Sequence, residues 1–119
     1  MSARGWIGVD LDGTIAHYEK YVGPTHIGEP IPAMVDRVKA WLADGHEVRI
    51  FTARMSDPDP VAREQVRDAV FNWTKIHVGV GLQATCIKDF AMWKLWDDRA
   101  VQVIPNTGRP VGGSTRGLS

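Results

Sequence analysis

Short apolar segments alternate with helical stretches along most of this chain, and this alternation constrains the fold more than any other sequence feature. The apolar segments are too short for independent helices and are typical of buried strands. The candidate strands are residues 6–10, 48–51, 84–87 and 93–96, with 100–104 as a fifth. Alternating strands and helices are typical of a parallel sheet covered by helices. We therefore expect an α/β fold with a central, mainly parallel sheet and helices on both faces.

Two apolar stripes at helical spacing predict the helices between these strands. The first helix should begin near Pro32, because a proline in the first turn loses no helical hydrogen bond. It should end at Gly45, which suits a left-handed cap. The second helix should begin at a cap supplied by Asp57 or Asp59 and end near His77.

The length of 119 residues fits one domain, which we place at residues 1–104. Residues 105–119 are rich in Gly, Pro, Ser and Thr and predict an exposed extension. Residues 16–30 contain glycines and prolines without a regular period, and we expect a loop or small flap there. No apolar run is long enough to predict a transmembrane helix, so no membrane partner is expected. The single cysteine, Cys86, suits a reducing cytoplasm, where we place the protein.

The charge balance of the chain gives no sign of a strongly charged binding face. Lys plus Arg number 14 and Asp plus Glu number 14, so the formal net charge is zero. A neutral chain gives no reason to expect an extended nucleic-acid-binding or membrane-binding face. A local basic patch stays compatible with this balance.

A polar side chain lies at the end of each of the first four predicted strands. These side chains belong to Asp10, Thr52, Lys88 and Asp97. Parallel α/β sheets bind ligands beyond the carboxyl ends of their strands. We therefore expect four segments that are distant in sequence to point polar groups into one crevice.

The first of these strand ends reads Asp-Leu-Asp-Gly-Thr over residues 10–14. Two carboxylates one residue apart can face a common site, where one attacks phosphorus and the other exchanges a proton with the leaving oxygen. Gly13 allows a sharp turn and a close approach of a ligand. An isolated Asp-X-Asp is more often a turn, but the apolar strand before it and the Gly-Thr after it favour a functional interpretation.

The other strand ends supply groups that phosphate chemistry needs. The Thr52 hydroxyl can hydrogen-bond a phosphoryl oxygen, and Arg54 can fork onto the same phosphate or onto a remote substrate group. Lys88 can neutralise a nucleophile and a phosphoryl group together. Asp97 and Asp98 repel each other unless a cation lies nearby, and their hard oxygens suit Mg²⁺. Taken singly, each of these residues also fits a surface or turn role.

In their order along the chain, these residues resemble the four motifs of the haloacid dehalogenase (HAD) superfamily. The resemblance covers residues 6 to about 104, and residues 95–99, Leu-Trp-Asp-Asp-Arg, resemble the double-aspartate variant of polynucleotide 3′-phosphatase domains and small phage and bacterial members. It implies a Rossmann-like fold and a magnesium-dependent phosphatase. The stretches after Thr14 and Thr52 are too short for a folded cap, so a capless member is expected.

The resemblance implies a role for each matched residue. Asp10 would be the nucleophile that forms an aspartyl-phosphate, and Asp12 the general acid and base, with its backbone carbonyl at the metal. Thr52 and Lys88 would hold the phosphoryl group. Arg54 lies outside the matched motifs, and its phosphate-binding role is a separate hypothesis. The magnesium site, with direct or water-mediated contacts, would comprise Asp10, Asp12, Asp97 and Asp98.

The implied activity is hydrolysis of a phosphomonoester, with a phosphorylated small molecule, a nucleotide or an oligonucleotide end as substrate. Dehalogenases lack the second aspartate of the first motif, so the presence of Asp12 favours phosphate chemistry. Two alternatives stay open: a phosphotransferase or pyrophosphate-cleaving enzyme with the same nucleophile, and a phosphate-binding protein without turnover. Only residues 16–30 are available to cover the site, unless a second subunit of a homo-oligomer contributes.

Overall fold

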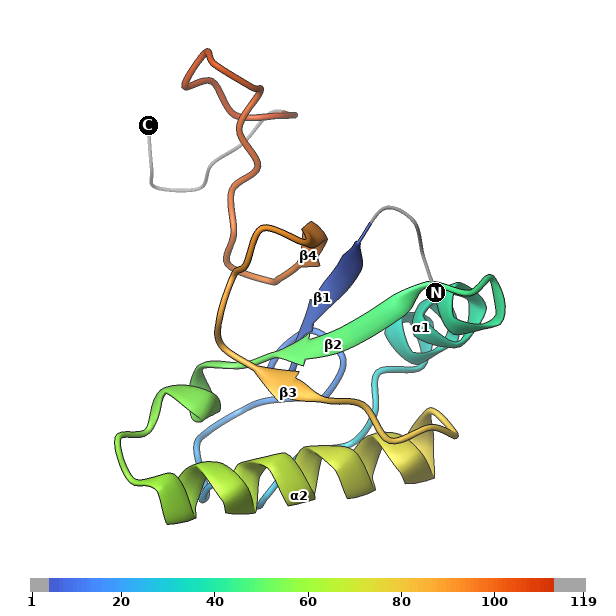
Figure 1. Ribbon diagram of the computed structural model, residues 1–119, viewed down its shortest axis with the longest axis vertical. Helices are drawn as coiled ribbons and strands as arrows, with labels where there is room; N and C mark the ends of the chain where they lie inside the picture. Colours follow the sequence, from blue (N-terminus) through green and yellow to red (C-terminus); the bar gives the residue numbers. More distant parts are fainter. Residues whose placement is uncertain (1–4, 113–119) are drawn as a thin grey trace.

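The computed structural model describes residues 5–112, which form a four-stranded sheet and two α-helices (Figure 1). The elements in chain order are β1 (Trp6–Asp10), α1 (Pro32–Ala43), β2 (Glu47–Phe51), the 3-10 helix η1 (Ala53–Ser56), α2 (Pro60–His77), β3 (Ala84–Thr85) and β4 (Met92–Trp96). The strand order is β3-β2-β1-β4, and all neighbouring strands are parallel. The expected α/β class with a parallel sheet is confirmed, and the described residues contain no folded cap.

Both helices begin and end where the sequence predicts. Pro32 is the first residue of α1, and Gly45 follows its end with a φ of 88°. Asp59 caps α2, because its carboxylate accepts a hydrogen bond from the Val61 backbone N–H at 3.0 Å. The turn chemistry of the sequence thus sets the lengths of both helices and the positions of the strands that follow them.

One face of the sheet carries the hydrophobic core. Ile7 and Val9 of β1 lie in register with the two buried residues of β2, Val48 and Ile50. These four side chains belong to one buried cluster that also contains Met34, Val35 and Val38 of α1 and Val66, Val70 and Trp73 of α2. Both helices therefore cover the same face, as two successive right-handed crossovers in one direction require. Within residues 5–112 the other face carries no α-helix, so the expected helices on both faces are not found there.

The opposite face is covered by a non-helical segment, residues 86–91, which we call the strap. The strap runs from the end of β3 to the start of β4, and it is too short to contain a crossover helix. Trp6 is completely buried on this face. Its indole N–H donates to Asp89 of the strap at 2.7 Å, and the Arg49 guanidinium lies 4.5 Å from the ring centroid.

The chain after β4 adds no further strand to the sheet. Residues 100–104, expected as a fifth strand, form only an isolated bridge between Val103 and Pro110. The segment folds back on itself, with the Val111 N–H donating to the Gln102 carbonyl at 2.7 Å. It projects away from the body of the molecule in Figure 1. β4 is therefore an edge strand, and Trp96, which ends the buried strand expected over residues 93–96, is 39% exposed.

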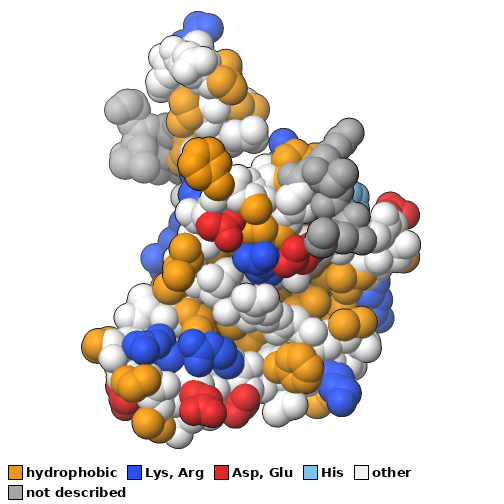
Figure 2. Space-filling view, in the orientation of Figure 1, with side chains coloured by type: hydrophobic (Ala, Val, Ile, Leu, Met, Phe, Trp, Pro, Cys, Tyr) orange, Lys and Arg blue, Asp and Glu red, His pale blue; other side chains and the backbone are white. Residues whose placement is uncertain are grey.

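The surface agrees with the neutral charge of the chain. Figure 2 shows acidic and basic side chains interspersed on one face, and hydrophobic side chains along the projecting segment. The described part of the expected extension, residues 105–112, is exposed except for the half-buried Pro110; residues 113–119 lie outside the described residues. No helix within residues 5–112 is long and apolar enough to cross a membrane.

Candidate functional site

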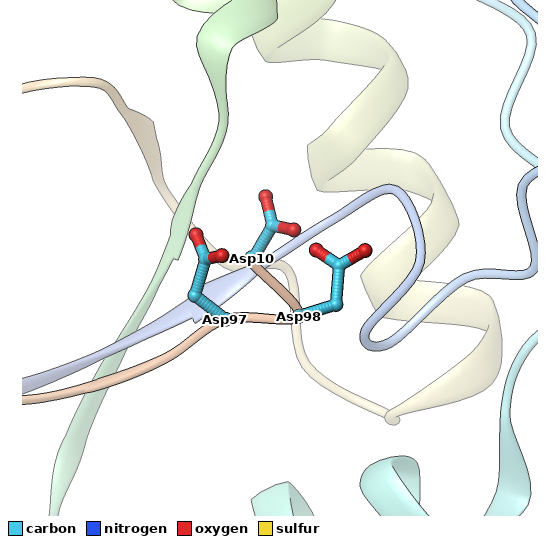
Figure 3. A group of neighbouring side chains, drawn as sticks. All are labelled: Asp10, Asp97 and Asp98. Carbon is cyan, nitrogen blue, oxygen red and sulfur yellow. The ribbon is translucent and has the colours of Figure 1, made fainter. Parts of the chain in front are cut away.

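Three carboxylates meet at the carboxyl ends of two neighbouring strands. Asp10 ends β1, and Asp97 and Asp98 directly follow β4, which pairs with β1 through Val9 and Trp96. One oxygen from each carboxylate lies within 4.8 Å of the others. Figure 3 shows the three side chains pointing to the same side, with Asp10 between the other two. The parallel pairing of β1 and β4 thus brings residues from the two ends of the domain together.

Gly13 allows the turn after β1 to approach these carboxylates. Its φ is +88°, a conformation that side-chain-bearing residues rarely adopt. A Cβ atom at this position would lie only 2.5 Å from Oδ2 of Asp98. The Asp-Leu-Asp-Gly turn and the Asp97–Asp98 pair therefore fit together only with glycine at position 13.

The environment of Asp10 disfavours its ionised form. Burial, a hydrogen bond with Asp98, and the negative charges of Asp97 and Asp98 raise the pKa of Asp10 from 3.8 to about 7. A hydrogen bond from the Thr14 hydroxyl, at 3.3 Å, acts in the opposite direction. A cation at this place would relieve the repulsion, and three hard carboxylates are ligands that Mg²⁺ accepts. The donor set therefore fits the expected metal.

Asp97 is held in place by the turn that it starts. Its Oδ1 atom accepts hydrogen bonds from the backbone N–H groups of Arg99 at 2.7 Å and Ala100 at 3.2 Å. Asp98 is exposed, whereas Asp97 is half buried. The two aspartates therefore differ in how firmly the backbone fixes them, although both face Asp10.

A cavity of about 720 Å³ opens in front of the carboxylates. Thr52 reaches it from the end of β2 and is buried, with its hydroxyl oxygen accepting a hydrogen bond from the Arg54 N–H at 3.2 Å. Most of the residues predicted for the site line this cavity, namely Asp10, Asp12, Thr52, Arg54, Asp97 and Asp98. The convergence of the strand ends at one crevice is thus observed for β1, β2 and β4.

Lys88 lies elsewhere. It is exposed on the strap and lines a neighbouring cavity together with Trp93 and Asp97. β3 ends at Thr85, earlier than the strand expected over residues 84–87, so Lys88 is not at a strand end. The structure does not bring Lys88 into the cavity of Asp10, and its phosphate-binding role remains a prediction.

Arg54 lies at the site in an unexpected way. Its Nε and Nη2 groups donate to the two oxygens of Asp12 at 2.9 and 2.8 Å. Its Nη1 group donates to backbone carbonyls of residues 16–30, which we call the flap. The Arg54 side chain is only 7% exposed. The predicted fork onto phosphate is therefore a fork onto Asp12, and the Asp12 carboxylate is separate from the three-carboxylate group.

Sequence reasoning missed the aromatic side of the cavity. Tyr18 and Tyr21 of the flap line the cavity and are 41% and 58% exposed. Cys86, expected in a buried strand, is half buried and also lines it. The available signal was the pair of tyrosines in a glycine-containing loop, because exposed aromatic residues near a polar site are often used for binding.

Comparison with known proteins bears on the fold. No family model matches the chain, and no curated protein matches it. A solved structure of a conserved protein from Bacteroides thetaiotaomicron is similar, with a TM-score of 0.57 and 24% sequence identity over 86% of this chain and 82% of that one. At this identity the match shows a shared fold and leaves the activity open.

Proposed function

We propose that this chain is a magnesium-dependent phosphohydrolase of the HAD type that cleaves a phosphomonoester through an aspartyl-phosphate on Asp10. The observation that carries the proposal is the meeting of Asp10, Asp97 and Asp98 at the carboxyl ends of two parallel strands. Asp12 follows two residues after Asp10 and lines the same cavity. This arrangement supplies a nucleophile, a second carboxyl group for proton transfer and a metal-binding set at one place.

In the first step, an oxygen of Asp10 attacks phosphorus and the bond to the leaving oxygen breaks. Asp12 gives its proton to that oxygen, so the alcohol leaves neutral. In the second step, Asp12 takes a proton from a water molecule that attacks the same phosphorus, which releases phosphate and restores Asp10. Asp10, Asp97 and Asp98 would hold the magnesium ion, which when bound would supply positive charge that offsets the carboxylates and the phosphoryl oxygens.

The remaining cavity groups support binding of the phosphoryl group. The Thr52 hydroxyl at the end of β2 is buried beside the cavity, where it can donate to a phosphoryl oxygen. Lys88 keeps its proposed role through the family resemblance alone, since it lies outside the cavity lining. Arg54 has no phosphate-binding role in this proposal, because its fork is bound to Asp12.

The cavity favours a substrate with an aromatic group, such as a nucleotide or a nucleic-acid end. Tyr18 and Tyr21 present partly exposed rings beside the carboxylates, and aromatic rings bind bases by stacking. The neutral charge of the chain argues against a long stretch of bound nucleic acid. The single cysteine is in keeping with action in the cytoplasm.

The test is phosphate release from p-nitrophenyl phosphate by the wild-type chain and by two variants. Wild type should release phosphate with Mg²⁺ and not with EDTA, and Asp10→Asn should be inactive with either. Asp36→Asn, a change to an exposed carboxylate on α1, is the matched control and should behave as wild type. Metal-independent release, or an Asp10→Asn variant with wild-type turnover, would show that the proposed chemistry is wrong.

A further inference from the structure

Arg54 joins two parts of the molecule that are distant in sequence. One edge of its guanidinium binds both oxygens of Asp12, at 2.9 and 2.8 Å. The other side binds the tip of the flap, with Nη1 donating to the carbonyl oxygens of Gly23 at 3.0 Å, Pro24 at 3.2 Å and His26 at 2.7 Å. A single buried side chain thus contacts the carboxylate and the loop together.

The base of the flap is held independently of Arg54. The His17 N–H donates to the Glu29 carbonyl at 2.8 Å, and the Ile31 N–H donates to the Ile15 carbonyl at 2.8 Å. The Trp73 indole N–H of α2 donates to the Gly28 carbonyl at 3.1 Å. Within residues 5–112, the hydrogen bonds that tie the tip of the flap to the body come from Arg54.

Tyr21 connects this arrangement to the cavity. The Arg54 guanidinium carbon lies 5.3 Å from the centroid of the Tyr21 ring, within the range of a cation–π contact. Tyr21 also lines the cavity and is 58% exposed. A ligand in the cavity can therefore contact the Tyr21 ring, and this ring packs against Arg54, the side chain that binds Asp12.

We propose that Arg54 is a positioning residue that couples the tip of the flap to the orientation of Asp12. The role of Asp12 in proton transfer rests on the proposed function, whereas the coupling itself rests on the contacts of Arg54. To give a proton to the leaving oxygen, one carboxylate oxygen of Asp12 must turn from the guanidinium toward the substrate. That turn weakens one of the two bonds of the fork, and the hold of Arg54 on the flap tip changes with it.

The coupling is measured by limited digestion of the full chain with chymotrypsin, following cleavage at Tyr18 and Tyr21. Arg54→Lys keeps the charge but cannot form the planar fork, and it should speed flap cleavage by about tenfold. Asp12→Asn should speed flap cleavage too, because it removes one charge from the pair. The double variant should be cleaved no faster than the faster single variant, because both changes break the same contact. Arg67→Lys, an exposed arginine of α2, is the matched control and should leave cleavage unchanged.

Two controls keep the result interpretable. Cleavage at Trp93 and Trp96 reports unfolding of the sheet, so the flap effect is the ratio of flap to sheet cleavage in each variant. Unchanged flap cleavage in Arg54→Lys, or additive effects in the double variant, overturns the coupling. This readout does not need turnover, so the coupling can stand if the proposed activity fails, and it can fail while the activity stands.

Kinetics separate positioning from phosphate binding. If Arg54 positions Asp12, Arg54→Lys lowers kcat for p-nitrophenyl phosphate while the inhibition constant of inorganic phosphate stays within about twofold of wild type. A large loss of phosphate affinity with kcat unchanged would instead assign Arg54 to substrate binding and overturn the positioning role.

Discussion

The candidate site has a strand-borne half and a flap-borne half, and the two are held in different ways. Asp10, Thr52, Asp97 and Asp98 lie at or directly after the ends of strands, where the hydrogen-bonded ladder of the sheet sets their positions. Tyr18 and Tyr21 lie on a loop whose tip is tied to the body by Arg54. The comparison teaches that the carboxylates proposed for the chemistry are placed by the backbone of the sheet, whereas the aromatic residues proposed to meet the substrate depend on one side chain.

The largest effect should come from the proposed nucleophile, Asp10, on the strand-borne half. Asp10→Asn keeps the shape of the side chain and removes the attacking charge, so turnover of p-nitrophenyl phosphate should be abolished. The variant should melt at least as high as wild type without metal, because the charge repulsion around Asp10 disappears. A folded Asp10→Asn variant that still turns over p-nitrophenyl phosphate would contradict the role assigned to Asp10. The melting temperature is the control, because it shows whether an inactive variant is still folded.

The proposed metal ligands should give the next largest effect. Asp97→Ala and Asp98→Ala should each raise the Mg²⁺ concentration needed for half-maximal activity, and one should do so much more than the other. The milder variant should lose about 10- to 100-fold in apparent Mg²⁺ affinity, which is typical of residues that support a metal without direct contact. Titration of activity against Mg²⁺ in each variant gives the measurement. If neither change alters the Mg²⁺ requirement, these aspartates do not form the metal site.

The pH dependence of stability provides a third test of the strand-borne half. The pKa of Asp10 is about 7 in the folded chain and near 3.8 in the unfolded chain, so the folded state keeps a proton that the unfolded state loses. Stability in EDTA should therefore fall as the pH rises from about 4 to about 7, because the unfolded state then binds fewer protons. Melting temperatures at several pH values check this, and Asp10→Asn should remove most of the slope. Equal slopes in wild type and Asp10→Asn would contradict the assignment.

The smallest effect is expected on the flap-borne half. Replacing Tyr18 and Tyr21 by Leu removes two stacking surfaces without touching the carboxylates. The specificity constant for a nucleoside monophosphate should fall by about tenfold or more, since stacking contributes about 1–3 kcal/mol per base. The constant for a small sugar phosphate should change little, and it serves as the internal control. An equal loss for both substrates would mean that the tyrosines shape the flap rather than recognise a ring.

The strand-borne half could be predicted from the sequence because its placement follows from local patterns. The apolar run before Asp10 and the one before Asp97 are recognisable as strands, and parallel strands bring their carboxyl ends to the same edge. Caps at Gly45 and Asp59 set the helix lengths for the same reason, since a turn conformation is encoded within a few residues. These predictions needed no knowledge of contacts between distant segments.

The parts that could not be predicted depend on long-range contacts. Arg54 has no local signal that it will bind Asp12 rather than a phosphate, because both partners are oxygen anions with the same geometry. The prediction of helices on the second face was wrong because β3 and β4 are connected only by the strap, residues 86–91, which is too short for a helix. Because β3 ends at Thr85, Lys88 belongs to the strap and lies outside the cavity of Asp10.

The strap also fixes the alignment of the strands that carry the proposed metal site. At the beginning of β1, the indole N–H of Trp6 donates to Asp89. The backbone N–H of Trp6 donates to the Ala91 carbonyl at 3.0 Å, just before β4 begins. These two bonds set where β4 starts against β1, next to an irregularity in their pairing. A slip of one residue would place a different side chain beside Asp10. The far end of the sheet therefore determines which carboxylates lie beside Asp10, the proposed nucleophile, although it is a full strand length away from that residue.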